Sequence, residues 1–178
     1  MSAVTLLEAK AHLKVLDDAD DVYIQTLIDV AEAQAEEITS RNLLETTNVF
    51  YLSKYMEVFE LPKSPLIAVD TIEYVPYGES ENVTLSADMY EVDNSCEPGR
   101  VRFLEDLYAA DLFKAIKVTY RSGFGTASDV PAPIKQWMLL RIGTLYENHE
   151  EIVVGTITSE IKSDYNDFLI SKYRVGRL

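Results

Sequence analysis

The most constraining feature of the sequence is a regular helical period close to the N-terminus. Apolar residues recur there three or four positions apart and share one side of a helix: Ile24, Leu27, Ile28, Ala31, Ala35 and Ile38. The acids Glu32, Glu36 and Glu37 lie towards the opposite, solvated side. We therefore predict an amphipathic helix that ends near Arg41 and Asn42, and this helix needs other elements to cover its apolar face.

A shorter helix is predicted before it. Thr5 and Glu8 have the spacing of a capping box, in which each side chain satisfies a backbone donor near the other. An apolar stripe follows, formed by Leu6, Leu7, Ala9, Leu13 and Leu16. The acids from Asp17 to Asp21 suit the positive N-terminal end of the next helix, and they lack the glycine and the terminal glutamate of a calcium-binding EF-hand loop. Residues 1–45 are thus predicted to form a helical pair.

Between residues 46 and 122, short runs rich in β-branched and aromatic residues replace the helical pattern. The runs are TNVFYL, MEVFEL, IAVDTIEYV, NVTL, MYEVD, RVRF and AIKVTY. Prolines and glycines separate them: Pro62, Pro65, Pro76, Gly78, Pro98 and Gly99. This texture predicts a β-rich, mostly antiparallel insertion between helical segments.

Residues 131–178 are predicted to be helical again. Ala132 precedes a proline and is pushed out of helical geometry, so we expect the helix to begin at Pro133. Its apolar residues cover most of its circumference, which predicts a buried central helix with Trp137 as a core anchor: Ile134, Trp137, Met138, Leu139, Leu140, Ile142 and Leu145. The predicted fold class is α+β. It is a helical bundle of two N-terminal helices, one central buried helix and one short C-terminal helix, with a β-rich antiparallel insertion, in a single composite domain of residues 1–178.

Charge and cysteine content limit the function. The 178 residues include 30 acids and 16 lysines and arginines, a net charge of −14. This charge argues against a protein that wraps DNA, because such a protein needs a basic surface; in the simplest interpretation it serves solubility. Cys96 is the single cysteine, which excludes an internal disulfide and suits a reducing compartment. The sequence shows neither an apolar run of membrane-spanning length nor the pattern of a signal peptide.

The common sequence motifs of catalysis are missing. The glycines of RSGFGTASD form no nucleotide-binding motif, since Ser128 stands where a dinucleotide fingerprint has its third glycine. His149 begins HEEIV, but Val153 stands where a zinc protease has its second histidine, and the other histidine is the distant His12. Cys96 has no adjacent base in sequence. We predict no catalytic, cofactor-binding or metal site, although carboxylate pairs among the 30 acids leave acid–base hydrolysis open.

The serial order of three segments is more informative than any single motif. The segments are LLEAKAHLKVLDDADDVYIQTLIDVAEAQAEEITSRNLL, LPKSPLIAVDTIEYV and VTYRSGFGTASDVPAPIKQWMLLRIGTLYENHEEIVVG. This order resembles the head–tail connector, or adaptor, family of tailed bacteriophages and prophages. The resemblance extends from Leu6 to Tyr173, with little match from Cys96 to Lys114 and from residue 156 to residue 166.

The resemblance implies a non-enzymatic virion protein without cofactors. Members of the family assemble as a ring, typically of twelve subunits, beneath the portal protein of the filled head. The ring extends the DNA channel, lets DNA pass without specific binding, and docks tail-side connector or stopper proteins. The chain would be made in the cytoplasm of the bacterial host and would have no membrane partner. An acidic channel wall would repel the DNA backbone and so prevent contacts that stall ejection.

The C-terminal segment is the candidate interface. Tyr165, Phe168, Leu169 and Tyr173 are spaced for one face of a short helix, and Lys172, Arg174 and Arg177 make a basic end on an acidic chain. The residues proposed for contact are Tyr165, Phe168, Leu169, Tyr173, Arg174 and Arg177. They suit docking to the portal or to an acidic surface of a neighbouring subunit, since arginine pairs bidentately with carboxylates. In the alternative interpretation the helix packs on its own subunit and the charges are solvated.

Two other functions remain open on the sequence. One is a small acidic hydrolase that uses a carboxylate pair. The other is a monomeric adaptor that binds one partner and never forms a ring.

Overall fold

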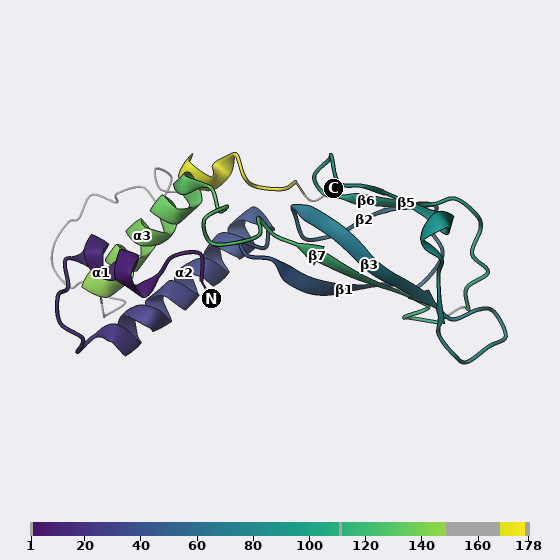
Figure 1. Ribbon diagram of the computed structural model, residues 1–178, viewed down its shortest axis with the longest axis horizontal. Coiled ribbons are helices and arrows are strands. Elements are labelled where there is room, and N and C mark those ends of the chain that lie inside the picture. The colour runs from purple at the N-terminus through teal and green to yellow at the C-terminus, as the bar shows by residue number, and fades with distance from the viewer. Residues whose placement is uncertain (1, 111, 149–167, 177–178) are drawn as a thin grey trace, which may run out of the picture. The chain divides into compact units, whose positions relative to one another are not determined.

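The computed structural model describes residues 2–110, 112–148 and 168–176. The chain divides into two compact units, which are described separately below. The helical unit comprises residues 1–39 and 125–174, and the β-rich unit comprises residues 40–124 and 175–178 (Figure 1). The division follows the predicted boundaries between helical and β-rich sequence closely, and the single composite domain stays a prediction.

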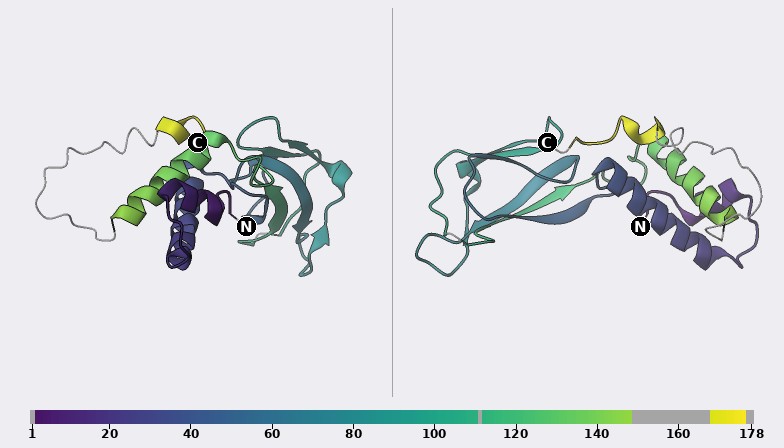
Figure 2. Two further views of the ribbon diagram at one scale, coloured as in Figure 1. Left: turned by 60° about the vertical axis from the view of Figure 1, so that its left-hand side comes forward. Right: turned by 180° about the vertical axis from the view of Figure 1, so that it is seen from behind.

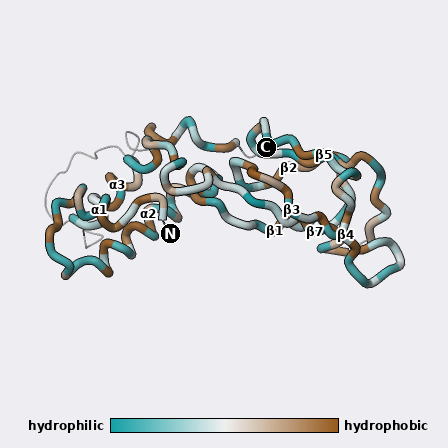
Figure 3. The backbone as a smooth tube through the Cα atoms, viewed as in Figure 1, coloured by the Kyte–Doolittle hydropathy of each residue, from teal (hydrophilic) through white to brown (hydrophobic). Residues whose placement is uncertain are grey.

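The helical unit begins with α1 (Leu6–Leu13) and α2 (Asp21–Thr39). The predicted capping box is confirmed, because the Thr5 hydroxyl accepts from the Glu8 backbone while the Glu8 carboxylate accepts from the Thr5 backbone. Lys14 ends α1 in a left-handed conformation. α2 buries the apolar face that its period predicts, including Ile24 and Ile28. Figure 3 shows hydrophobic and hydrophilic residues succeeding one another along α2. Among the described residues, no helix is both long and apolar enough to cross a membrane.

The third helix, α3 (Ala132–Glu147), starts one residue earlier than predicted, with Pro131 as its N-cap. Pro133 still lies in the first turn, where its missing N–H leaves no helical hydrogen bond unmade. α3 buries Ile134, Trp137, Met138 and Ile142, whereas Leu139, Leu140 and Leu145 are half-buried. Residues 168–171 form the short C-terminal helical turn. The prediction of two N-terminal helices, one central buried helix and one short C-terminal helix is thus confirmed.

The described part of the β-rich unit contains seven strands, and each falls on one of the seven predicted runs. They are β1 (Thr46–Leu52), β2 (Val58–Glu60), β3 (Leu66–Tyr74), β4 (Val83–Thr84), β5 (Tyr90–Asp93), β6 (Arg100–Phe103) and β7 (Ile116–Ser122), with a 3-10 turn, η1 (Ala87–Met89), before β5. One sheet has the order β1-β7-β3-β4 and the other β2-β6-β5. All pairings between these strands are antiparallel, as predicted. Figure 2 shows the two sheets as two layers of one unit.

The core of the β-rich unit lies between the two sheets. Along β7, Ile116, Val118 and Tyr120 are buried, while the alternate residues of the strand face outwards. This alternation is the period of a strand with one covered face. The other sheet contributes Phe59 and Phe103, whose ring centroids are 5.4 Å apart. Since both sheets bury one face against each other, each outer face stays available for other contacts.

Candidate functional site

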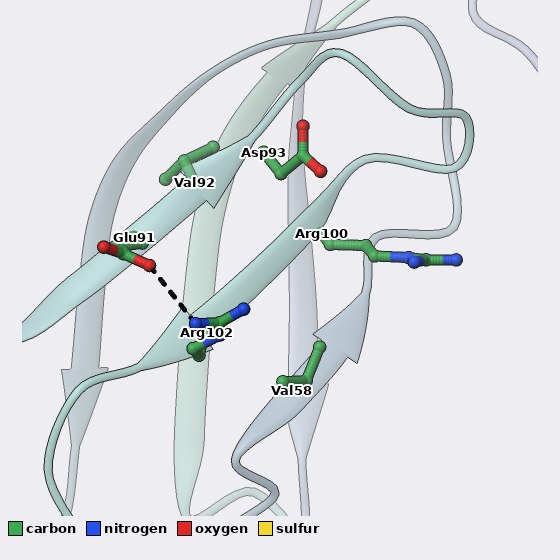
Figure 4. Close-up of a pocket in the computed structure, with 6 residues that line it drawn as sticks. All are labelled: Val58, Glu91, Val92, Asp93, Arg100 and Arg102. Carbon is green, nitrogen blue, oxygen red and sulfur yellow. Dashed lines mark ion pairs between the residues drawn. The ribbon is translucent and has the colours of Figure 1, made fainter.

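A depression on the β-rich unit lies on the outer face of the β2-β6-β5 sheet. Two arginines of β6, Arg100 and Arg102, project there between acidic neighbours (Figure 4). Arg100 lies 3.1 Å from Glu60 on β2, and Arg102 lies 3.7 Å from Glu91 on β5. These pairs join cross-strand neighbours, which is a common way to stabilise an exposed sheet face. The depression is therefore lined by cross-strand ion pairs. It lacks the enclosed apolar lining of a substrate pocket.

Asp93 on the same face lacks the raised pKa of a catalytic general acid. Hydrogen bonds from the Ser95 hydroxyl and backbone hold the pKa of Asp93 below its ordinary value, so this carboxylate is ionised at neutral pH. A general acid in a carboxylate pair needs the opposite shift. Among the described carboxyl groups, Glu32 on α2 does have a raised pKa, because it is half-buried. Glu32 accepts a short hydrogen bond from Ser2 and so holds the N-terminal segment against α2.

Cys96 lies beside oxygen atoms that do not favour its thiolate form. Its Sγ lies 3.4 Å from a carboxylate oxygen of Asp93 and 3.3 Å from the carbonyl oxygen of Pro98. Burial and the Asp93 carboxylate together raise the pKa of the thiol. A catalytic cysteine needs the thiolate, which a neighbouring base or cation favours. The surroundings of Cys96 therefore oppose nucleophilic chemistry.

The glycine-rich stretch after β7 is structural. Gly123 has a φ of +129°, and a Cβ atom there would lie 2.2 Å from the backbone oxygen of Leu44. After Gly125, the Asp129 carboxylate accepts hydrogen bonds from the backbone N–H and the hydroxyl of Thr126, at 2.9 and 2.5 Å. Asp129 thus uses its charge to fix the turn before α3. The stretch leads the chain out of the last strand, as predicted.

The acids between the first two helices bind a lysine and the backbone. The Lys10 ammonium lies 2.7 Å from Asp18 and 2.6 Å from Asp21, and Asp17 accepts from the Ala19 backbone. α2 then begins at Asp21, which confirms the helix-start interpretation of this segment. Among the described residues, no group of histidine, cysteine, aspartate or glutamate side chains is arranged to hold a metal ion. His149 and Val153 of the HEEIV segment lie outside the described residues.

The structure describes part of the candidate interface. Phe168 is 76% exposed, Leu169 and Tyr173 are half-buried, and Arg174 is exposed. The Lys172 ammonium lies 4.8 Å from the centroid of the Tyr173 ring, which is a cation–π contact. Ile170, which sequence reasoning passed over, is fully buried and holds the turn on the helical unit. Tyr165 and Arg177 lie outside the described residues, so the proposed set is brought together only in part.

A set of exposed aromatic and apolar residues at one end of the β-rich unit was missed by sequence reasoning. Its members are Tyr77, Tyr108, Leu112 and Phe113, in the loops that follow β3 and precede β7. The sequence could have indicated them, because LYAA and LFKA place large apolar residues outside any periodic run. We call this set the aromatic tip. Large exposed apolar groups gathered at one place mark interaction surfaces.

The sequence matches a known family model. Residues 3–96, more than half of the chain, match the "Phage gp6-like head-tail connector protein" family. The match ends at Cys96, at the start of the region where little resemblance is visible in the sequence. No curated protein matches the chain.

Solved structures share the fold over nearly the whole chain. A protein of the "Neck of empty GTA particle computed with C6 symmetry" has a TM-score of 0.80 and 18% identity, covering 99% of this chain and 91% of that one. A protein of the "Virion of native gene transfer agent (GTA) particle" has a TM-score of 0.78 and 19% identity, with the same coverage. A third, from the "Neck of native GTA particle computed with C12 symmetry", has a TM-score of 0.72, 19% identity and the same coverage.

Proposed function

Because the chain belongs to the phage gp6-like head-tail connector family, we propose that it forms a ring beneath the portal protein, extends the DNA channel and docks tail-side components. The family match is the observation that carries this proposal. The chain is a structural protein of the connector class and not an enzyme. The hydrolase alternative is therefore set aside.

The ring is supported by the proteins that share the fold. Two of them come from particle necks computed with C6 and C12 symmetry, so they occur in rotationally repeated assemblies. A ring forms when one surface of a subunit contacts a different surface of the next and the rotation closes. Twelve copies of this chain, placed at the head–tail junction of the virion, would give such a ring. A monomeric adaptor is the alternative that the experiment below separates.

The charge of α2 and the segment before it suits a DNA channel. From Val15 to Ser40 the sequence contains eight acids and no lysine, arginine or histidine. Asp29 and Glu37 are exposed on α2. A wall with this charge repels phosphates and releases few counterions, so DNA slides past it without being held. We propose that this acidic segment faces the channel.

The C-terminal turn is the proposed contact with the portal. Phe168 is exposed on the helical unit, and the exposed Lys172 and Arg174 follow it within six residues. An exposed aromatic side chain beside cations matches the composition of binding hot spots. The buried Ile170 anchors the turn, so the contact residues are presented on a fixed base.

The test is assembly of the purified chain on its own portal protein, followed by native mass spectrometry and electron microscopy. We expect a closed ring on the portal. The double variant Phe168→Ser with Lys172→Glu should weaken binding at least about tenfold, which corresponds to about 1.4 kcal/mol. The loss should be greater at low salt, where the lost attraction is least screened.

The matched control is Leu7→Ser, which removes another exposed apolar side chain of the helical unit and should leave binding unchanged. Wild-type chain that stays monomeric beside its portal would overturn the ring. A ring that forms equally well with the double variant would remove the C-terminal turn from the contact.

A further inference from the structure

The aromatic tip is the most exposed apolar feature of the β-rich unit. Tyr77 is 79%, Tyr108 83% and Phe113 92% exposed, and Leu112 lies beside Phe113. They belong to the loops that follow β3 and precede β7, and the end of β3 pairs with the start of β7 through Tyr74 and Ile116 (Figure 1 shows the two strands side by side). Single exposed apolar side chains are common, but several that gather in one place mark an interaction surface.

Backbone hydrogen bonds tie the two loops to each other. The Tyr77 N–H donates to the Tyr108 carbonyl at 2.8 Å, and Pro76 pairs with Ala109 in an antiparallel bridge. Residues on either side of such a bridge lie directly opposite one another, so Tyr77 and Tyr108 are cross-strand neighbours on one face. The backbone that carries the two tyrosines is therefore paired before any partner arrives, which lowers the entropic cost of ordering the loops on binding.

Phe113 is presented in the same way. The loop from Ala110 to Ala115 starts and ends on Val75: the Ala110 N–H donates to the Val75 carbonyl at 2.7 Å, and the Val75 N–H donates to the Ala115 carbonyl at 2.9 Å. The Ser53 hydroxyl donates to the Phe113 carbonyl at 3.0 Å. These bonds hold the chain on both sides of Phe113 next to the strand end that carries the tyrosine pair, while the Phe113 ring is 92% exposed.

The charges around the tip define the partner. Glu79, Glu81, Glu105 and Asp106 are exposed in the same two loops. The nearby Lys114 ammonium lies over the Tyr51 ring, 4.9 Å from its centroid. A phosphate backbone is disfavoured beside these carboxylates, whereas lysines and arginines are favoured.

We infer that the aromatic tip docks a protein surface that has an apolar pocket with a rim of lysines and arginines, and that this surface belongs to the tail-side component of the neck. The inference rests on the proposed connector function. A connector needs two different docking surfaces, one for each neighbour. The C-terminal turn on the helical unit is assigned to the portal, and the tip is a separate, preorganised surface on the β-rich unit.

The experiment uses virus particles produced with the double variant Tyr77→Ser, Tyr108→Ser. Quantitative mass spectrometry measures the connector content of purified heads, and electron microscopy measures the fraction of heads with tails. We expect wild-type connector content and at least a tenfold fall in the tailed fraction. Val49→Ser, which alters an exposed residue on β1 of the same unit, should leave both values unchanged.

A second variant tests the charge of the rim and guards against misfolding. Glu79→Lys with Glu105→Lys changes only exposed loop residues, and it should also lower the tailed fraction without lowering connector content. Normal tailing in both variants would overturn the inference. Loss of the variant connector from heads would overturn it too, because the tip would then serve the portal or a second copy of this chain. Wild-type chain absent from necks would instead reject the connector function itself.

Discussion

The two units distribute their charge differently. The helical unit contains 16 acids and seven lysines and arginines; within residues 1–39 there are nine acids and two lysines, and Lys10 alone contacts two of those acids. Residues 40–124 contain 14 acids and eight lysines and arginines. There the four cations on strands lie opposite acids of neighbouring strands, as Lys117 does with Glu73 at 2.7 Å and Arg121 with Asp70 at 3.0 Å.

The excess acid of the helical unit acts as an electrostatic field, whereas the charges of the β-rich unit act mainly through local ion pairs. In the helical unit excess acid accumulates along one helix and repels anions at a distance. In the β-rich unit, cross-strand pairing neutralises much of the charge on the outer faces, and these exposed pairs contribute little energy each. The helical unit is therefore suited to a channel wall. The β-rich unit is suited to short-range docking, where shape and apolar contact decide affinity.

The largest expected effect tests the core of the helical unit. Trp137→Ala should lower the free energy of unfolding by about 3–5 kcal/mol, because Trp137 is 4% exposed and its removal leaves a cavity. Urea denaturation followed by circular dichroism measures the change, with Trp137→Phe as a milder control. If residues 1–178 form a single domain, both units unfold in one shifted transition. A β-rich unit that keeps its wild-type midpoint would contradict the single domain.

A second substitution tests the β-rich unit through its backbone. Gly123→Ala should cost about 1–3 kcal/mol, the range for a residue forced into a sparsely populated conformation, and the contact with the Leu44 carbonyl adds to this cost. Gly78→Ala is the matched control, since Gly78 has a φ of +85° with open space around it. Equal denaturation midpoints for the two variants would show that the close approach at Gly123 has no energetic weight.

The smallest effect is a pH response of opposite sign in the two units. Burial raises the pKa of Glu32 in the helical unit above its ordinary value of 4.5, so ionised Glu32 costs stability at neutral pH. This cost disappears as the pH falls through the raised pKa. In the β-rich unit, hydrogen bonds from Arg41 hold the pKa of Glu97 below its ordinary value of 4.5. Ionised Glu97 therefore stabilises the fold at pH values above 4.5, and this stabilisation is lost as the pH falls from 4.5 through the lowered pKa.

Unfolding free energies measured across pH separate the two groups. Glu32→Gln should abolish part of the stability gained between pH 7 and 4.5. Glu97→Gln should abolish part of the stability lost below 4.5, and since Glu97 is partly exposed we expect less than about 1 kcal/mol. An unchanged pH profile in either variant would assign that carboxyl no role.

Local signals in the sequence located the elements well. The capping box at Thr5 and Glu8, the period of α2 and the seven β-like runs each depend on residues within a few positions of one another. Short-range spacing is also enough to place Trp137 in a core, because a helix apolar on most sides has to be buried. The family resemblance came from the same serial order, and the family model covers its first half.

Tertiary structure decided which distant residues meet. The sheet order β1-β7-β3-β4 brings the last strand between the first and third, and Arg41 reaches Glu97 across 56 positions. Tyr77 and Tyr108 became neighbours only when two loops paired, so the sequence could mark these residues as unusual but could not bring them together. Local propensity specifies backbone conformation a few residues at a time. The contacts that build surfaces depend on how the whole chain closes, and on which faces the two sheets use against each other.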